Sequence, residues 1–161
     1  MPVLIALAIS IGALAVVATW AFLVPLAFLG VQIWQGFVAW ASFYHSGGKG
    51  AGFQKTLLCM AFGVIVGALS VWLAGSLGGL GAFAAPAAVG IGAAVLVLGA
   101  HIGFISTIPA SVYGFACIAG LILLKGLTPF AAIIPTLISV VLGAAFGWLS
   151  EFIGGKITKK T

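Results

Sequence analysis

Charged residues are almost missing from this sequence. Only 4 % of its 161 residues are charged, namely six lysines and one glutamate, and arginine and aspartate are absent. A soluble domain has about 25 % charged residues, because they cover its surface. A single carboxylate cannot form an acid–base pair, and six scattered lysines do not make the clustered basic face that binds phosphate backbones. The composition therefore excludes an ordinary soluble domain, and it predicts neither an enzyme nor a nucleic-acid-binding protein.

Metal-binding side chains are equally scarce. The chain has two cysteines, Cys59 and Cys117, and two histidines, His45 and His101. These residue types suit zinc, but none of their spacings resembles a metal motif. Both cysteines lie inside apolar stretches, which is typical of buried free thiols. We therefore expect no metal and no other cofactor.

Apolar residues are abundant instead. Hydrophobic residues make up 64 % of the chain and glycine contributes another 24 residues. A helix that spans a bilayer needs about 20 predominantly apolar residues. Six segments approach this length, and they predict a single transmembrane domain over residues 1–161 with six short helices, at about 3–22, 27–44, 56–75, 83–100, 109–124 and 130–153. The first segment is too long for a signal peptide and no positive charge precedes it, so we expect it to stay as a membrane helix.

The lysines predict the orientation of these helices. Six crossings place five lysines on one side of the membrane, and Lys125 alone on the other; the five are Lys49, Lys55, Lys156, Lys159 and Lys160. Cytoplasmic loops carry the excess of lysine. Both termini are therefore expected in the cytoplasm.

The two halves of the sequence resemble each other at a shift of 80 residues. At this shift Thr56-Leu57 matches Thr136-Leu137, Gly63 matches Gly143, and Ile11-Gly12-Ala13 matches Ile91-Gly92-Ala93. The second and fifth segments match less well, since Gly36-Phe37 meets Gly114-Phe115 at a shift of 78. Three crossings in each half is an odd number, so the second half would enter the membrane upside down. The pattern predicts a 3+3 inverted repeat, with repeat one at about 1–80 and repeat two at about 81–161.

Small residues recur every four positions in the third and sixth segments. They are Gly63 and Gly67 in the third, and Ser139, Gly143 and Gly147 in the sixth. Such stripes allow close approach of helix backbones, within one subunit or between subunits, and they suggest a homo-oligomer. Glu151 continues the second stripe toward the cytoplasmic end, where we expect it to reach water, a C-terminal lysine or Lys55.

The stretch from His101 to Pro109 is unusual because it joins two cytoplasmic helix ends without any charged residue. Non-helical backbone at membrane depth is tolerated where it is buried in protein or lines a cavity. Ser106 or Thr107 could cap the following helix, which suits Pro109 in its first turn. A solute site and a simple tight turn are both compatible with this stretch.

Aromatic residues gather in the second segment. Trp34, Phe37 and Tyr44 fall near one helix face, with Trp40 beside it and Gln35 next to Trp34. An aromatic constriction beside an amide would suit a filter for small neutral solutes. The alternative is that these rings face lipid or the protein core.

Three stretches together resemble a known family: 34–48 (WQGFVAWASFYHSGG), 55–58 (KTLL) and 104–115 (FISTIPASVYGF). They are similar to the YcdZ-like family of small bacterial inner-membrane proteins, a family without an assigned function. The resemblance covers essentially the whole chain. It implies a compact multi-helix protein of the bacterial inner membrane and supplies no site residues.

From the residues themselves we expect a passive channel or facilitator for a small neutral or weakly acidic or basic solute. Coupled transport usually requires ionisable residues inside the membrane, and the segment interiors have none. The alternative is a structural or accessory membrane protein that packs with a partner and conducts nothing. For the first reading, the expected solute-lining residues are Trp34, Gln35, Phe37, Trp40, His101, Phe104, Ser106, Thr107 and Tyr113.

Overall fold

The structure, a computed structural model, describes residues 2–158, and this part of the chain is helical without any strand. Met1, Lys159 and Lys160, on which the signal-peptide and orientation arguments also draw, lie outside the described residues. Six α-helices and three short 3-10 helices follow each other in the order α1 (Val3–Leu23), η1 (Ala27–Leu29), α2 (Ile33–His45), α3 (Lys49–Ser76), η2 (Gly78–Phe83), α4 (Ala84–Gly99), η3 (Gly103–Ile105), α5 (Ile108–Lys125) and α6 (Ile133–Ile157).

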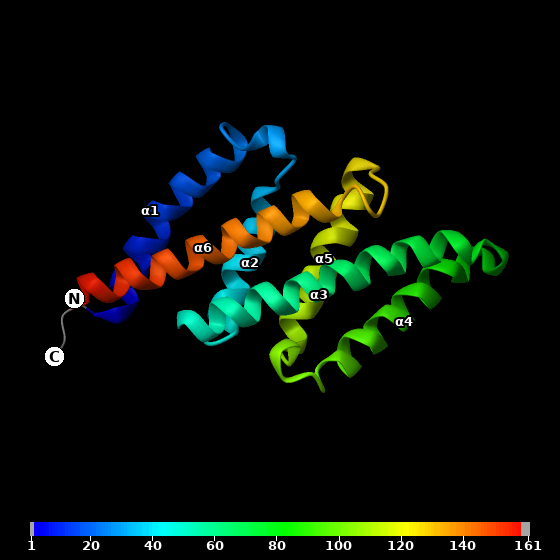
Figure 1. Cartoon of the computed structure of the whole chain (residues 1–161). Helices are drawn as coiled ribbons and strands as arrows, with labels where there is room; N and C mark the ends of the chain where they lie inside the picture. Colours follow the sequence, from blue (N-terminus) through cyan, green and yellow to red (C-terminus); the bar gives the residue numbers. More distant parts are fainter. Residues whose placement is uncertain (1, 159–161) are drawn as a thin grey trace.

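The two longest helices, α3 and α6, form the middle of the molecule. They lie side by side and run in opposite directions, while α2 and α5 cross them (Figure 1). The main partner of α3 is α5, and the main partner of α6 is α2. The outer helices are α4, which returns along α3, and α1, which lies along α6 (Figure 1). The four inner helices thus enclose the core between them.

The outer helices bury only one narrow face each. The buried residues of α1 are Ala6, Ser10, Ala18 and Phe22, and those of α4 are Ala84, Ala88, Gly92 and Leu96. These positions repeat at multiples of four residues, which is one side of a helix. The remaining faces are apolar and exposed, a pattern that water does not favour over so large an area.

Five helices are long and apolar enough to cross a membrane: α1, α3, α5, α6 and α4 with the preceding η2. The expected second spanning helix is shorter than predicted. Ala27–Leu29 form a 3-10 turn, Gly30 adopts a left-handed conformation with φ of 71°, and α2 begins only at Ile33. Its 13 residues reach about 20 Å, less than the bilayer core of about 30 Å.

The third helix is longer than predicted. The polar residues before Thr56 were expected outside the helix, but α3 already begins at Lys49. Gly47, Gly48 and Lys49 have φ values of 96°, 66° and 56°, so the chain reverses within three residues and the helix starts at once. The sixth helix is displaced in the same sense, since it spans Ile133–Ile157 rather than 130–153.

Candidate functional site

Uncharged polar side chains are buried between α2 and the helices around it. We call this group the polar seam and define it as Gln35, Ser42, Ser46, Thr56 and Thr136. Gln35, Ser42, Thr56 and Thr136 are completely buried. The three α2-side positions, 35, 42 and 46, fall on one helix face, because they are seven and four residues apart. The seam therefore follows one side of α2 through the protein interior.

Gln35 is the centre of the seam. Its Nε2 donates hydrogen bonds to the backbone oxygen of Cys117 at 2.9 Å and to Oγ1 of Thr136 at 3.2 Å. Its Oε1 is buried and has no hydrogen-bond partner among the described residues. A buried polar atom without a partner is costly and rare in folded proteins. The Gln35 amide thus links α2, α5 and α6 and still offers one free acceptor.

The lower part of the seam joins α2 to α3. The Thr56 hydroxyl lies 3.4 Å from Oγ of Ser42 and donates to Oγ of Ser46 at 3.4 Å. These are long contacts between neutral groups, which makes them weak. A second free polar atom, Oγ of Ser111 at the start of α5, is also buried without a partner in the described part of the chain.

A separate polar cluster fixes α1 and α2 against α6. Oγ of Ser150 accepts hydrogen bonds from Nε1 of Trp40 at 3.0 Å and from the Tyr44 hydroxyl at 2.8 Å, and it donates to the Gly147 backbone oxygen at 2.7 Å. Oγ of Ser10 donates to the Ser150 backbone oxygen at 2.9 Å. All polar groups of Ser150 are thereby satisfied, which favours a structural role for this cluster.

The aromatic residues that were expected to form a filter point in different directions. The ring of Trp34 packs against Gly120 of α5, whereas Trp40 is buried and stacks on Phe146 of α6 at 5.8 Å between centroids. Phe37 stacks on the outer side of Trp40 at 6.0 Å and is 41 % exposed. The three rings thus serve helix packing on separate faces of α2, and the structure does not bring them around one opening.

The stretch between α4 and α5 is a surface turn. His101 and Ser106 are exposed, Phe104 is 63 % exposed, and only Ile105 points into the core. Nδ1 of His101 is 3.0 Å from the Leu98 backbone oxygen of its own helix. The expected side-chain cap is not formed, because the half-buried Thr107 occupies the N-cap position of α5 without a capping hydrogen bond. Pro109 does lie in the first turn of α5, as predicted.

Tyr113 connects α5 to α2 near the same turn. Its hydroxyl is 3.1 Å from Nδ1 of His45, and the two rings meet edge to face. The surface hollows that we describe lie elsewhere, beside α1, between α3 and α4, and between α3 and α6, and none of the nine expected solute-lining residues lines them. Of those nine residues, Gln35 alone belongs to the polar seam.

The small-residue stripes pack inside the chain. A Cβ atom on Gly63 would collide with the Ser111 backbone oxygen, and one on Gly143 would collide with the Gly36 backbone oxygen. Gly67 and Gly147 make similar approaches to side chains of α5 and α2, respectively. Ser139 hydrogen-bonds to the backbone nitrogen of Gln32 at 3.0 Å. Since these stripes are used within one chain, they give no support to the expected homo-oligomer, which stays a prediction.

The remaining candidate residues have plain structural surroundings. Cys59 and Cys117 are buried free thiols, as predicted. Within residues 2–158 no group of three or more His, Cys, Asp or Glu side chains is arranged to hold a metal ion.

Glu151 binds a partner that the sequence did not indicate. Its Oε2 accepts a hydrogen bond from the backbone N–H of Lys49 at 2.6 Å, at the first residue of α3. We had expected water, a C-terminal lysine or Lys55. A carboxylate at a helix N-terminus satisfies a free N–H group and interacts favourably with the helix dipole. The only acidic residue of the chain therefore ties the end of α6 to the start of α3.

Replacing Glu151 should weaken this connection. We expect Glu151→Gln to lower the free energy of unfolding by about 0.5–1 kcal/mol, because the charge–dipole attraction is lost, and Glu151→Ala by about 1–2 kcal/mol, because the cap is lost too. Thermal unfolding of the detergent-solubilised protein, followed by circular dichroism, measures both. The difference between wild type and Glu151→Gln should shrink at high salt. Equal stability of all three proteins at low salt would contradict this role of Glu151.

Sequence reasoning did not single out Ser42, Thr56, Thr136 and Ser150 as functional candidates. A usable signal was present, since Thr56 and Thr136 are polar residues in apolar helices and occupy equivalent positions in the two halves of the sequence. Polar side chains inside membrane helices usually face other helices.

Comparison with known proteins identifies one family. A family profile with the description "Protein of unknown function (DUF1097)" matches residues 8–155, which is nearly the whole chain. No curated protein and no solved structure matches the chain significantly. The chain belongs to the DUF1097 family.

Proposed function

We propose that this chain is a multi-pass membrane protein whose two halves form an inverted repeat. The helix contacts support the repeat because they come in matched pairs. α3 packs on α5 as α6 packs on α2, and α4 lies along α3 as α1 lies along α6. Exchanging α1, α2 and α3 with α4, α5 and α6 leaves this contact pattern unchanged, and the central helices α3 and α6 run in opposite directions (Figure 1).

Burial along the two central helices supports the same repeat. Seven of the eight buried positions of α6 fall, at a shift of 80 residues, on buried positions of α3. The seven pairs are 56 and 136, 59 and 139, 60 and 140, 63 and 143, 64 and 144, 67 and 147, and 70 and 150. A chance similarity of two glycine-rich helices would not place the same positions against neighbours.

The second and fifth helices match at a different shift. Gly63 meets the Ser111 backbone as Gly143 meets the Gly36 backbone, and Gly67 meets Ile118 as Gly147 meets Phe43. Positions 36 and 111, and 43 and 118, are each 75 residues apart. The 78-residue shift of the Gly-Phe pairs in the sequence therefore differs by about one helical turn from the pairing of the contacts. This explains why α2 and α5 resemble each other only weakly at a shift of 80.

The short helix α2 fits this architecture because its irregular start is satisfied by hydrogen bonds. Ser139 of α6 accepts from the Gln32 backbone N–H, and the Gln32 side chain donates to the backbone oxygens of Gly30 and Val31, each at 3.0 Å. Backbone groups at membrane depth need such partners. We propose that η1 and α2 cross together, that all six crossings are used, and that both termini face the cytoplasm of a bacterium from its inner membrane.

We further infer that the protein is a passive facilitator for a small neutral or weakly acidic or basic solute. The observation that carries this inference is the polar seam, in which the Gln35 amide keeps a free buried acceptor while no charged side chain lies among the seam residues. A neutral hydrogen-bonding molecule could exchange partners along such a line, whereas an ion would meet no compensating charge.

The second candidate is a structural or accessory membrane protein that conducts nothing. The close packing of the four inner helices favours it, because Gly63 and Gly143 bring backbones into contact where the two halves meet. In this arrangement the seam is closed, and polar side chains act only as links between helices. A facilitator would need these helices to separate during passage.

Flux through proteoliposomes separates the two candidates. We expect purified protein to raise the permeability of vesicles to at least one of water, urea, glycerol and ammonia, as measured by stopped-flow light scattering or a pH-sensitive dye. The double variant Thr56→Val and Thr136→Val should reduce this flux about tenfold, since each lost contact to a desolvated solute costs about 1 kcal/mol or more. The control is Thr128→Val with Ser76→Ala, which changes exposed residues of the same types. Permeability equal to that of protein-free vesicles for all four solutes would favour the accessory role.

A further inference from the structure

Two adjoining surface hollows lie between the first turns of α3 and the last turns of α6. The inner hollow has a volume of about 170 Å³ and is lined by Gly50, Phe53, Ala145 and Trp148. The outer hollow has a volume of about 550 Å³, and its lining includes Lys49 and Lys156. Gly50 and Trp148 line both, so the hollows are continuous. The combined groove is therefore apolar at one end and carries two ammonium groups at the other.

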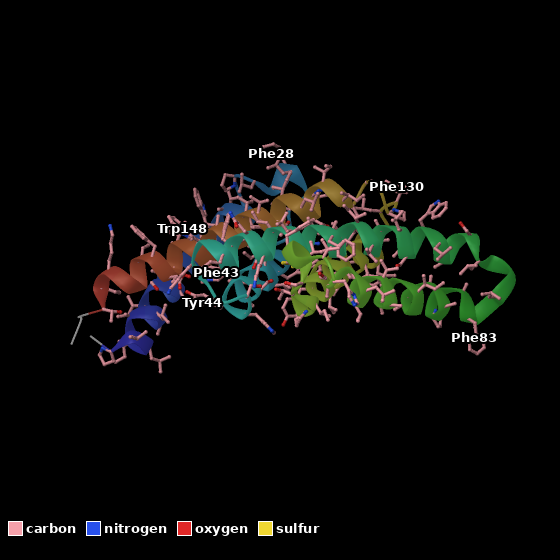
Figure 2. The ribbon with its side chains drawn as sticks, turned by 60° about the horizontal axis from the view of Figure 1, so that its bottom comes forward. Phe28, Phe43, Tyr44, Phe83, Phe130 and Trp148 are labelled. Atoms are coloured by element: carbon pink, nitrogen blue, oxygen red, sulfur yellow. The ribbon has the colours of Figure 1, made fainter. Side chains whose placement is uncertain are left out.

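A row of side chains along α6 marks how this groove is oriented. Trp148 stacks on Phe152 with ring centroids 5.5 Å apart and planes at 8°, and Nζ of Lys156 lies 4.3 Å from the centre of the Phe152 ring. Figure 2 shows Trp148 projecting from the outer side of α6. Tryptophan followed by lysine toward the helix end is typical of a membrane interface, where rings sit at headgroup depth and ammonium groups extend into the polar layer.

The charges in the outer hollow leave the two lysines available. Lys49 and Lys156 are exposed. The third charged group, Glu151, directs Oε2 to the Lys49 backbone N–H, and its other oxygen lies against Gly48. Its negative charge is thus placed at the start of α3, and the hollow keeps a net charge of +1 from two lysines and one glutamate.

We propose that this groove binds one anionic phospholipid, with its phosphate between Lys49 and Lys156 and part of an acyl chain in the hollow beside Phe53 and Trp148. The proposal rests on the membrane insertion proposed above. Charge complementarity selects an anionic headgroup. The apolar hollow distinguishes a lipid from a free phosphate ion, which would use the lysines alone.

Native mass spectrometry of the detergent-solubilised full-length protein tests this site, with phosphatidylglycerol and phosphatidylcholine of identical chains as probes. We expect phosphatidylglycerol to be retained preferentially as one molecule per chain. Lys49→Gln and Lys156→Gln should each weaken its retention about fivefold, since a lysine near an anionic surface contributes about that factor. Lys55→Gln, at the same end but outside the groove, and Lys125→Gln, at the end of α5, are the matched controls and should change little.

A second variant tests the apolar hollow without touching the charges. Ala145→Phe fills the space beside Trp148, and we expect it to reduce phosphatidylglycerol retention to the level of the double lysine variant. Inorganic phosphate at millimolar concentration should not displace the lipid. Equal retention of the two lipids, equal loss in the Lys55→Gln control, or displacement by phosphate would overturn the proposal. If instead the chain stays in solution without detergent, membrane insertion itself is contradicted, and the lipid site fails with it.

Discussion

Gly63→Ala should destabilise the protein by about 3 kcal/mol, at the upper end of the usual cost of overpacking a core. A Cβ atom on Gly63 has no room, because the Ser111 backbone oxygen already occupies its place. A flexible side chain could turn away, but a backbone atom moves only if α5 moves with it. Since α5 is the main partner of α3, the whole contact between these helices would have to open.

The inverted repeat adds a second, independent position to this test. Gly143→Ala should destabilise by a similar amount, because its Cβ atom would collide with the Gly36 backbone oxygen between α6 and α2. The matched controls are Gly75→Ala and Gly155→Ala, which are also 80 residues apart and have no atom within 4 Å of the added Cβ. In these controls alanine should stabilise the helix by at most about 1 kcal/mol.

Unfolding in mixed detergent micelles with increasing sodium dodecyl sulfate measures these four variants, followed by circular dichroism or tryptophan fluorescence. A large loss for Gly63→Ala with none for Gly143→Ala would argue against equivalent packing of the two halves. Wild-type stability for both would mean that the helices are not as closely packed as the structure has them.

Gln35→Met should abolish solute flux while leaving the stability of the protein within about 1 kcal/mol of wild type. Methionine has nearly the same volume as glutamine, so the packing around position 35 is kept. The variant loses two hydrogen bonds of Nε2, which inside membrane proteins average about 0.6 kcal/mol each. It also removes the buried Oε1 without a partner, which relieves a cost of about 1–3 kcal/mol. These contributions roughly cancel.

The two readouts together separate a functional from a structural glutamine. If Gln35 only connects helices, Gln35→Met lowers stability and leaves no flux to lose. If it contacts the passing solute, flux falls while stability is unchanged. The control is Gln54→Met, an exposed position near the start of α3, which should alter neither quantity. Normal flux in a folded Gln35→Met protein would remove Gln35 from the proposed path.

Several aromatic residues show how local sequence and tertiary position diverge. Phe28 and Phe104 occupy the middle of the 3-10 turns η1 and η3, and both are largely exposed, although only Phe104 was expected near a solute. In Figure 2, Phe28 and Phe130 project from one edge of the molecule and Phe83 from its far end, whereas Phe43 lies inside. Periodicity within one helix cannot tell these cases apart, because all faces of these helices are apolar.

The sequence by itself determined the helical class, five of the six long apolar helices, the buried thiols and the glycine stripes, because these follow from composition and from spacing along one helix. Only the tertiary structure decided that the stripes meet backbones of the same chain, that Glu151 caps α3, and that Gln35 shares the interior with Thr136. Each of these contacts joins residues about 75 to 105 positions apart. In a chain with almost no charge, nothing local specifies such pairs, since they depend on which helix faces fit together at close approach.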